Sequence, residues 1–510
     1  MVQPDDDQVI RVEVVLAPAR RRREEAIRIE ADREVAFTAG DQAPLTKSSA
    51  RTKQRLGRVH EVHRRIVAVG HGRGPTVRSH AAGAATIDAM PEAVDASIAA
   101  VPRDEAPPQP LSRNRDFAVV LTTQSISALG DAVTFTALPL LVLALTGSGL
   151  AMGVVGAIGA FSDVVFAMIA GVVADRSDRK RMMLLADLGR AILTAMIPLS
   201  VYVGGPTMGV VLLVAAPMSI LRSFFMAGYI ASVPALVGRQ QIGRANGTFE
   251  AVYSTAFIIG PAIAGLLVTS IGPGPTLAID ALSFAVSAAG LLFVRRDLRA
   301  PIDRVHGRVV TEIREGIDYI VAQPILRATI LFWGAISCLS APLVIALVVM
   351  VTHDLGDEPA VLGLVLTGFG AGTVVGSLLA ARRSTHRHIA PMLLGGSVAM
   401  GVCLIVLSAV SAVPVLIGLA FLSGVAEMTV ALTYVTVRTA YSPDELLGRI
   451  ASTARTVSLG LQPIALIVAG ALIDLASGAT VIGAIGIAMC LVSLAFVPVG
   501  VLRTTSLQPR

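Results

Sequence analysis

The sequence has little charge and few aromatic residues for its length. Of its 510 residues, 15% are charged, 4% are aromatic and 54% are hydrophobic. A soluble globular protein of this size carries more charge and fewer apolar residues, so this composition excludes that class. It predicts an integral membrane protein.

The sequence also lacks the motifs that many enzymes and metal proteins need. Its three cysteines lie inside apolar segments without CxxC spacing, which predicts small buried hydrophobic residues: Cys338, Cys403 and Cys490. No GxxxxGKS phosphate loop is present, which argues against direct coupling to ATP. The histidines lack ligand spacing. We therefore expect no enzyme, no metal and no cofactor.

Long apolar runs follow one another from Phe117 onward. Each is long enough to cross a bilayer, which takes about 20 residues in a helix. The sequence predicts twelve spans, near residues 117–145, 149–174, 182–203, 207–236, 248–270, 275–294, 326–350, 360–381, 389–411, 413–436, 450–474 and 478–501. The predicted fold class is therefore an all-α membrane protein.

The loops between these spans alternate in charge. Those at 146–149, 204–206, 271–275, 353–359, 411–414 and 477–480 contain no Lys or Arg. Those at 175–181, 238–244, 295–308, 382–388 and 438–449 are basic. By the positive-inside rule, the basic loops and both termini face the cytoplasm of a multi-pass protein in the inner cell membrane. The basic residues of these loops also contribute to the net charge of +6, so the charge is explained by membrane topology and does not require nucleic acid as a partner.

The longest loop within the membrane part divides the spans into two sets of six. It predicts domains at 113–294 and 326–502, joined by a cytoplasmic linker at 295–325 and followed by a tail at 503–510. The linker contains EIREGIDYIVAQPIL, whose charged and apolar residues alternate at helical spacing, as in an amphipathic surface helix. Two equal halves are typical of a repeat-built transporter. The repeat itself is weak, because GSLLAARR at Gly376 has Ala380 where the first half has Asp175.

The first 112 residues are polar and Arg-rich. The alternation in VIRVEVVL is compatible with a small strand pair, and a cytoplasmic extension that regulates the protein or contacts lipid is one interpretation. The segment lacks a coherent core pattern, so we favour a disordered extension or sequence upstream of a native start at Met90.

The stretch GVVADRSDRKR follows the second predicted span. Its pattern resembles the signature loop of the major facilitator superfamily, carried here by Gly171, Asp175, Arg176, Arg179 and Lys180. Asp178 stands where glycine is commoner in that signature. We expect Gly171 to permit close helix approach and Asp175 to meet arginine or a helix N-terminus across the two halves. The loop is thus a candidate cytoplasmic gate.

The fifth span contains IIGPAIAGLL. Gly260, Pro261 and Gly265 resemble the antiporter motif of the same superfamily, where proline kinks the helix and the glycines permit close packing.

Three further stretches narrow this resemblance. SISALGDAVTFTALPLLVLALTGSG, RANGTFEAVYSTAFIIGPAIAGLL and AIDALSF look like the branch that holds macrolide-efflux proteins and the enterobactin exporter. The resemblance covers Phe117 to about Leu502. It implies two pseudo-symmetric six-helix bundles with alternating access, which usually export amphipathic compounds in exchange for protons.

Ionisable side chains inside spans are costly and mark candidate functional positions. Asp131 is the first of these, and helical spacing places it on one polar stripe with Gln124, Ser127 and Thr134. We expect the stripe to face a water-filled cavity, the alternative being a packing contact with another helix.

Several other spans carry candidates for proton coupling or the substrate cavity. They are Asp163 deep in span two, Arg222 in span four, Glu427 with Ser423 and Tyr434 on span ten, and Arg455 with Gln462 on span eleven. Arg222 is placed to hold a carboxylate ionised, and Arg455 fits an interhelical gate as well as a substrate contact. Asp187 and Arg190 lie one turn apart and predict a structural pair. Asp280 suits structure or transport equally.

These features predict a secondary transporter, expected to be a monomer, that exports a small amphipathic molecule in exchange for protons. The protonatable carboxylate is Asp131 or Glu427. The low aromatic content favours a neutral or anionic substrate such as a macrocycle or siderophore. An importer or lipid flippase of the same fold, or a membrane receptor or scaffold without transport, are the alternatives.

Overall fold

The computed structural model describes residues 110–504, except 206, 300–308, 384–388 and 444–445. In this part of the chain every regular element is a helix, and the one β-bridge, between Asp178 and Arg299, is isolated. Twelve helical segments are long and apolar enough to cross a membrane. The predicted all-α membrane fold with twelve spans is thereby confirmed. The predictions for residues 1–109, including the strand pair and Met90, lie outside the described residues, as does most of the 503–510 tail.

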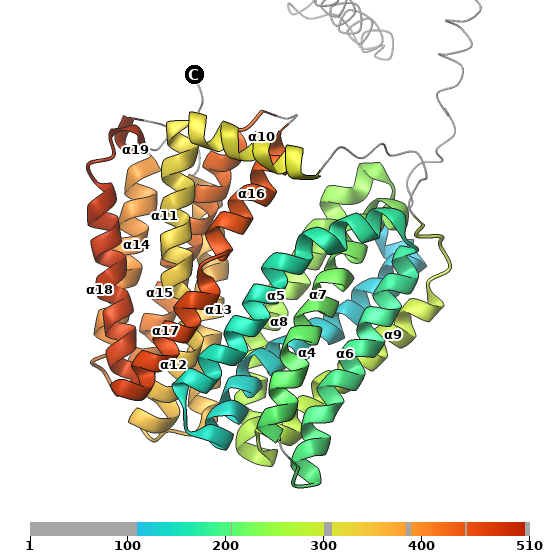
Figure 1. Cartoon of the computed structure of the whole chain (residues 1–510), viewed down its shortest axis with the longest axis horizontal. Helices are drawn as coiled ribbons and strands as arrows, with labels where there is room; N and C mark the ends of the chain where they lie inside the picture. Colours follow the sequence, from blue (N-terminus) through green and yellow to red (C-terminus); the bar gives the residue numbers. More distant parts are fainter. Residues whose placement is uncertain (1–109, 206, 300–308, 384–388, 444–445, 505–510) are drawn as a thin grey trace, which may run out of the picture. The chain divides into compact units, whose positions relative to one another are not determined.

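The first six spans pack against one another, coloured blue to yellow-green in Figure 1. They are α4 (Arg115–Thr146), α5 (Gly149–Arg176), α6 (Arg179–Tyr202), α7 (Thr207–Val237), α8 (Ile242–Ile271) and α9 (Pro273–Phe293). Helix α4 contacts α8 and α9, and α6 contacts α7 and α9. Fully buried side chains such as Phe284 and Leu291 fill the space between these helices. We call α4–α9 the first group.

The last six spans form a second group, from α11 to α18, coloured yellow to red. Its helices are α11 (Pro324–Ser340), α12 (Leu343–Val349), α13 (Pro359–Arg383), α14 (Ile389–Leu407), α15 (Val413–Ala440), α16 (Leu447–Leu459), α17 (Gln462–Leu475) and α18 (Gly478–Phe496). A π-helical turn, η3 (Met350–Asp354), extends α12. Helix α10 (Val309–Ala322) precedes the group, and the short α19 (Gly500–Thr504) follows it.

Two spans of the second group are interrupted. Span seven breaks at Pro342, between α11 and α12. Span eleven breaks at Gly460 and Leu461, before α17 begins at Gln462 with Pro463 in its first turn. Proline has no backbone N–H to donate and its ring clashes with the preceding turn, so a helix tends to stop ahead of it. The last span ends at Phe496, earlier than predicted from hydropathy, because a turn containing Pro498 follows.

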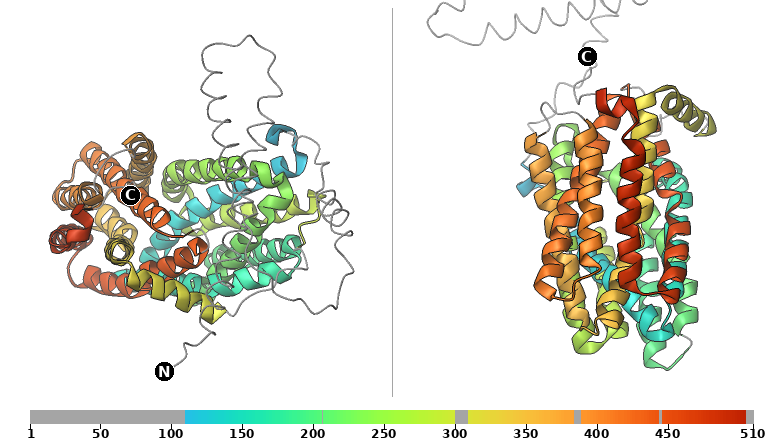
Figure 2. Two further views of the ribbon diagram at one scale, coloured as in Figure 1. Left: turned by 90° about the horizontal axis from the view of Figure 1, so that it is seen from above. Right: turned by 90° about the vertical axis from the view of Figure 1, so that its left-hand side faces the viewer.

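The long helices run roughly parallel between two ends of the molecule, as Figure 2 shows. At one end lie the basic loops 175–181 and 295–299, where Lys180 donates to the carbonyl of Val294 and Arg296 to that of Leu236. We call this the basic end, and the other, whose loops lack Lys and Arg, the opposite end.

The two groups meet mainly through two helix pairs, α5 with α17 and α8 with α13. Glycines permit this close approach. A Cβ on Gly470 would lie 2.5 Å from the carbonyl oxygen of Gly149, and one on Gly265 would lie 2.6 Å from that of Pro359. All four residues belong to the half of their helix nearest the opposite end. The groups are therefore held tightly together on that side.

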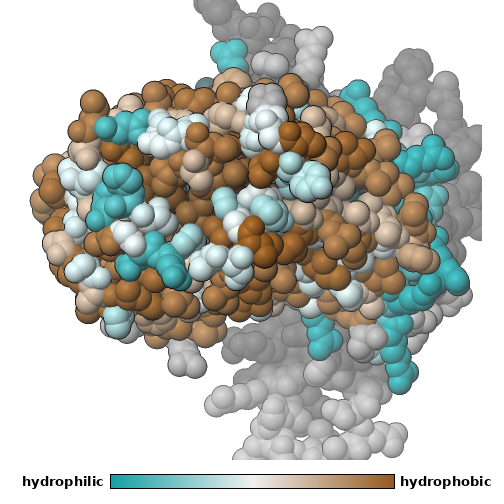
Figure 3. All heavy atoms as spheres, turned by 90° about the horizontal axis from the view of Figure 1, so that it is seen from below, coloured by the Kyte–Doolittle hydropathy of each residue, from teal (hydrophilic) through white to brown (hydrophobic). Residues whose placement is uncertain are grey.

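The outer surface of the helices is apolar. Large hydrophobic side chains such as Leu185, Ile192 and Leu282 are about two-thirds exposed, at 66%, 64% and 65%. Viewed from the opposite end, brown apolar residues occupy much of the rim in Figure 3. A soluble monomer rarely exposes so much apolar surface, whereas lipid covers it in a multi-pass membrane protein.

Candidate functional site

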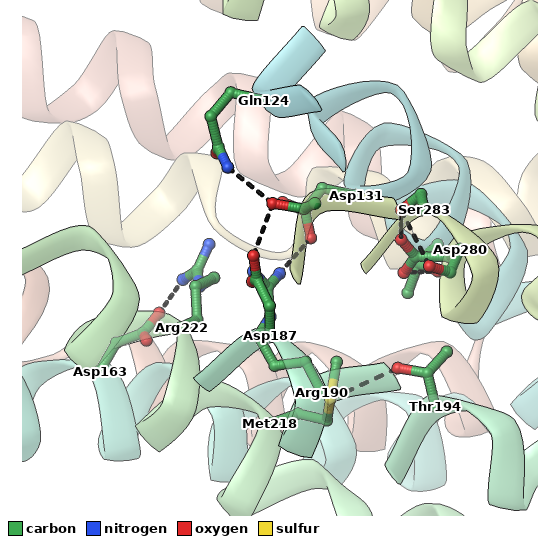
Figure 4. Close-up of polar contacts among 12 residues, drawn as sticks. Gln124, Asp131, Asp163, Asp187, Arg190, Thr194, Met218, Arg222, Asp280 and Ser283 are labelled. Carbon is green, nitrogen blue, oxygen red and sulfur yellow. Dashed lines mark hydrogen bonds and ion pairs between the residues drawn. The ribbon is translucent and has the colours of Figure 1, made fainter. Parts of the chain in front are cut away.

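Asp131 on α4 lies beside an arginine from α6. The Arg190 guanidinium donates to Asp131 Oδ1 at 2.5 Å, and the Asp131 side chain remains 28% exposed whereas Arg190 is only 3% exposed (Figure 4). Arg190 also lies 3.6 Å from Asp187 Oδ1, one turn earlier on the same helix. One buried arginine therefore links two carboxylates, one of them partly accessible.

A chain of hydrogen bonds continues from Asp187 to the first helix. The Ser287 hydroxyl of α9 donates to Asp187 Oδ2 at 2.5 Å, and the Gln124 amide of α4 donates to that hydroxyl oxygen at 2.9 Å. Asp187 and Ser287 are fully buried. Buried polar groups keep such partners because leaving them unpaired is costly.

A third carboxylate, Asp280 on α9, lies next to the same stretch of α4. Thr134 donates to its Oδ2 at 2.6 Å and Ser283 to its Oδ1 at 3.0 Å. Gly130 makes room for it, because a Cβ there would lie 2.4 Å from Asp280 Oδ1. Asp280 is completely buried and receives only hydroxyl donors in these bonds.

The polar stripe on α4 thus lies mainly between helices. Gln124 and Thr134 bond to α9, Ser127 is 2% exposed, and Asp131 reaches α6. The expectation that the whole stripe faces a wet cavity does not hold, because hydroxyl and carboxyl groups on α9 pair with it. Asp131 is the member whose carboxyl group stays partly open.

A second ion pair joins α5 to α7. Arg222 donates to Asp163, and the Ser223 hydroxyl donates to the other carboxylate oxygen at 3.3 Å. Few polar side chains lie near Asp163 on its own helix, and the residues that bind it come from a different span. The prediction that Arg222 faces a carboxylate agrees with this geometry.

Glu427 on α15 lies apart from these networks. It lines a cavity of about 350 Å³ together with Ser423, Gln462 and the aromatic ring of Trp333. Tyr434, two turns further along α15, stacks on Trp333 with ring centroids 5.4 Å apart. Arg455 is exposed and does not share a continuous face with Gln462, because the break at Gly460 separates α16 from α17.

The signature loop contacts the first group in this structure. Asp175 lies 4.0 Å from Arg179, whose Nε donates to the carbonyl of Ala174, and Lys180 donates to the end of α9. Arg176 is exposed. Asp178 caps α6 by accepting from the backbone N–H of Arg181 at 3.1 Å, which gives this departure from the signature a structural role.

Gly171 makes no close helix contact in this structure, so the packing role expected of it stays a prediction. A Cβ on Gly171 would meet nothing within 4 Å. In the fifth span, by contrast, a Cβ on Gly260 would lie 2.4 Å from that of Ala132, and Gly265 adjoins Pro359. Pro261 lies inside the continuous helix α8, and its carbonyl approaches Gly363.

Sequence reasoning missed the contact that closes the opposite end. Asp474, near the end of α17, accepts from the Ser148 hydroxyl at 2.7 Å, from the backbone N–H of Leu150 at 3.1 Å and from that of Gly149. These donors begin α5, so a carboxylate of one group caps a helix of the other. No local signal distinguishes Asp474, since its donors lie more than 320 residues away. Among the described residues, no cluster of three or more His, Cys, Asp or Glu side chains suits a metal ion.

Comparisons with known proteins agree with this architecture. A family model described as "Transmembrane secretion effector" matches residues 106–508. The chain is 27% identical over 366 residues to the multidrug efflux pump Tap of Mycolicibacterium fortuitum, covering 70% of this chain and 89% of that protein. It is 24% identical over 265 residues to macrolide efflux protein A of Streptococcus pyogenes, covering 52% and 65%.

Solved structures share the fold at low identity. A bacterial homolog of the human lysosomal transporter Spinster, inward-facing and unoccupied, superposes with a TM-score of 0.60 at 13% identity, covering 76% of this chain and 95% of that one. The nucleoside transporter NupG gives 0.64 at 11% identity, covering 76% and 100%.

Proposed function

This chain belongs to the transmembrane secretion effector family of the major facilitator superfamily, and from that premise we propose that it exports a small amphipathic compound in exchange for protons. It is a transporter and not an enzyme. Drug efflux is supported by relatives named multidrug and macrolide efflux pumps. The exchange for protons, the amphipathic substrate and the inner-membrane orientation are our proposal.

The carboxylates of the first group carry the proposal of proton coupling. Four carboxylates lie within the spans: Asp131, Asp163, Asp187 and Asp280. Among the described residues, Arg190 and Arg222 alone form ion pairs with them. Uncompensated charge is expensive inside a membrane, so four carboxylates and two arginines favour at least one bound proton. We assign the exchangeable proton to Asp131, because its carboxyl group is partly exposed and its arginine, Arg190, is shared with a second carboxylate that can keep it when Asp131 is protonated.

Movement of Arg190 links the proton to the conformation. When Asp131 is ionised, Arg190 is shared between it and Asp187. Protonation of Asp131 removes one of the two charges and leaves Arg190 to Asp187, which changes the contact between α4 and α6. A ligand-driven shift between two states requires such a difference in interactions.

Alternating access is supported by the contacts between the two groups. The groups are closed against each other near the opposite end, through Asp474 and the glycines of α5, α8, α13 and α17. With the basic loops in the cytoplasm, we propose that this arrangement is the inward-facing state. The signature loop lies at the basic end, and we propose that Asp175 meets the second group when that end closes.

Substitution of Asp131 by Asn tests the proton coupling. We expect uptake of ethidium or a macrolide into inside-out vesicles, driven by an imposed pH gradient, to fall by about 100-fold or more, in line with loss of a proton-transfer group. Asp318→Asn on the exposed face of α10 is the matched control and keeps native uptake. Unchanged gradient-driven uptake by Asp131→Asn would remove Asp131 from the mechanism.

A further inference from the structure

The cavity beside Glu427 is lined mainly by apolar side chains of the second group. Its aromatic walls are Trp333 of α11, Phe369 of α13 and Phe135, which comes from α4 of the first group. A volume of about 350 Å³ lies near the lower end of the range for small-molecule sites, about 300–1,000 Å³. The cavity therefore suits a compact ligand better than a macrocycle.

Glu427 is the one ionisable side chain among the described residues that line this cavity. No described residue forms an ion pair or a hydrogen bond with its carboxyl group. Asp131, Asp163 and Asp187 of the first group differ, because each has an arginine partner. A carboxylate in an apolar site without a partner is costly, and a positive charge brought by a ligand removes that cost.

A serine hydroxyl in the cavity also lacks a partner. Ser340 lines the cavity, and its hydroxyl oxygen is buried without a hydrogen bond in the described structure. Ser423, one turn before Glu427 and 1% exposed, has the Cys403 thiol within hydrogen-bonding reach. Buried hydroxyl groups are usually satisfied, so Ser340 indicates room for a polar group of a ligand or for water.

We infer that this cavity binds a compact lipophilic monocation, with the Glu427 carboxylate as its counter-ion. The hydrocarbon part of the ligand packs against Trp333 and Phe369, and the aromatic ring of Trp333 adds a cation–π attraction. This inference rests on the proposed export function and names its substrate class. It favours the charge opposite to that expected from the low aromatic content, because a single carboxylate in an apolar cavity outweighs the number of aromatic rings.

Trp333 provides a direct measurement, because it is the only tryptophan in the chain and lines the cavity. We expect tetraphenylphosphonium to quench its fluorescence saturably in the purified full-length protein without any gradient. Tetraphenylborate has nearly the same size and the opposite charge, and we expect no saturable quenching from it. Equal binding of the two ions would overturn the inference.

Substitution of Glu427 by Gln isolates the charge. We expect the Kd for tetraphenylphosphonium to rise by about tenfold or more, the loss typical of removing one partner of a buried charge contact. The matched control, Glu358→Gln in an exposed loop at the opposite end, keeps the native Kd. Native affinity in Glu427→Gln would refute the role of Glu427.

A measurement on the unsubstituted protein covers the case in which Glu427→Gln does not fold. Dicyclohexylcarbodiimide modifies carboxyl groups in apolar sites, and mass spectrometry locates the modified residue. We expect tetraphenylphosphonium to protect Glu427 while Asp280 keeps its reactivity, and lack of protection would contradict the inference. Because no gradient is present, these binding results are independent of transport by Asp131→Asn.

Discussion

At the scale of single residues, the arrangement depends on how buried charges are shared. Arg190 is 3% exposed and serves both Asp131 and Asp187, while Glu427 has no protein partner among the described residues. The two carboxylates suggested first by the sequence, Asp131 and Glu427, therefore have different environments. The first belongs to a hydrogen-bonded network suited to a proton, and the second faces a cavity suited to a ligand.

Removal of the shared arginine should destabilise the protein. Arg190→Gln leaves Asp131 and Asp187 without their cation, and breaking a buried ion pair in this way costs about 3–5 kcal/mol. We expect a clearly lower apparent melting temperature in detergent, with partial recovery in the double variant Arg190→Gln/Asp187→Asn. Arg181→Gln is the control, because the Arg181 side chain is 76% exposed. Equal melting of the two single variants would show that the shared pair does not stabilise the fold.

At the scale of helices, glycines set the distance between the two groups. Helices α8 and α13 approach so closely that a Cβ on Gly363 would lie 2.4 Å from the carbonyl oxygen of Pro261. Such contacts between backbones occur where small residues line both helices. The helices of spans seven and eleven are also interrupted, at Pro342 and at Gly460. Residues next to these interruptions, Ala341 and Gln462, line the cavity beside Glu427.

A single methyl group at this seam should disturb the closed end. Gly363→Ala forces α8 and α13 apart, and overpacking of this kind costs about 1–3 kcal/mol. We expect a lower melting temperature and slower transport. Gly418→Ala on α15 is the matched control, because a Cβ there meets nothing within 4 Å. Native stability and transport in Gly363→Ala would mean that the seam adjusts without cost.

At the scale of the whole molecule, one carboxylate caps a helix across the two groups. Asp474 of α17 accepts three hydrogen bonds at the start of α5. A negative charge at a helix N-terminus is favourable, and its loss together with weaker capping costs about 1 kcal/mol. The population of the state closed at the opposite end should depend on this contact.

Spin-label distances measure that population. We introduce Leu145→Cys and Leu475→Cys, which lie on exposed positions of α4 and α17, into a chain whose three native cysteines are replaced by alanine. Asp474→Asn should shift the distance distribution toward longer values, by about fivefold in the ratio of open to closed states for about 1 kcal/mol. Asp357→Asn, in a loop of the same end, is the control. An unchanged distribution in Asp474→Asn would show that the cap does not hold the end closed.

Local properties of the chain predicted the fold well. Runs of about twenty apolar residues and the alternation of basic loops identified all twelve spans, because membrane insertion depends on hydropathy and charge within one segment. The proline interruptions in spans seven and eleven were missed, since hydropathy continues across Pro342 and Pro463. For the candidate site, helical spacing identified Asp131, and the cost of charge inside a span identified Asp163 and Arg222, but neither argument gave their partners.

The sequence by itself determined the class of protein, the number of spans and the intramembrane charges, because each of these is a property of one helix or loop in a low-dielectric solvent. Only the tertiary structure decided which charges meet. Asp131 joins Arg190, Asp163 joins Arg222 and Asp474 joins α5 across distances of 59 to 326 residues along the chain. Such pairings depend on which faces of two helices turn toward each other. Packing between helices decides this, and the periodicity of residues within one helix cannot predict it.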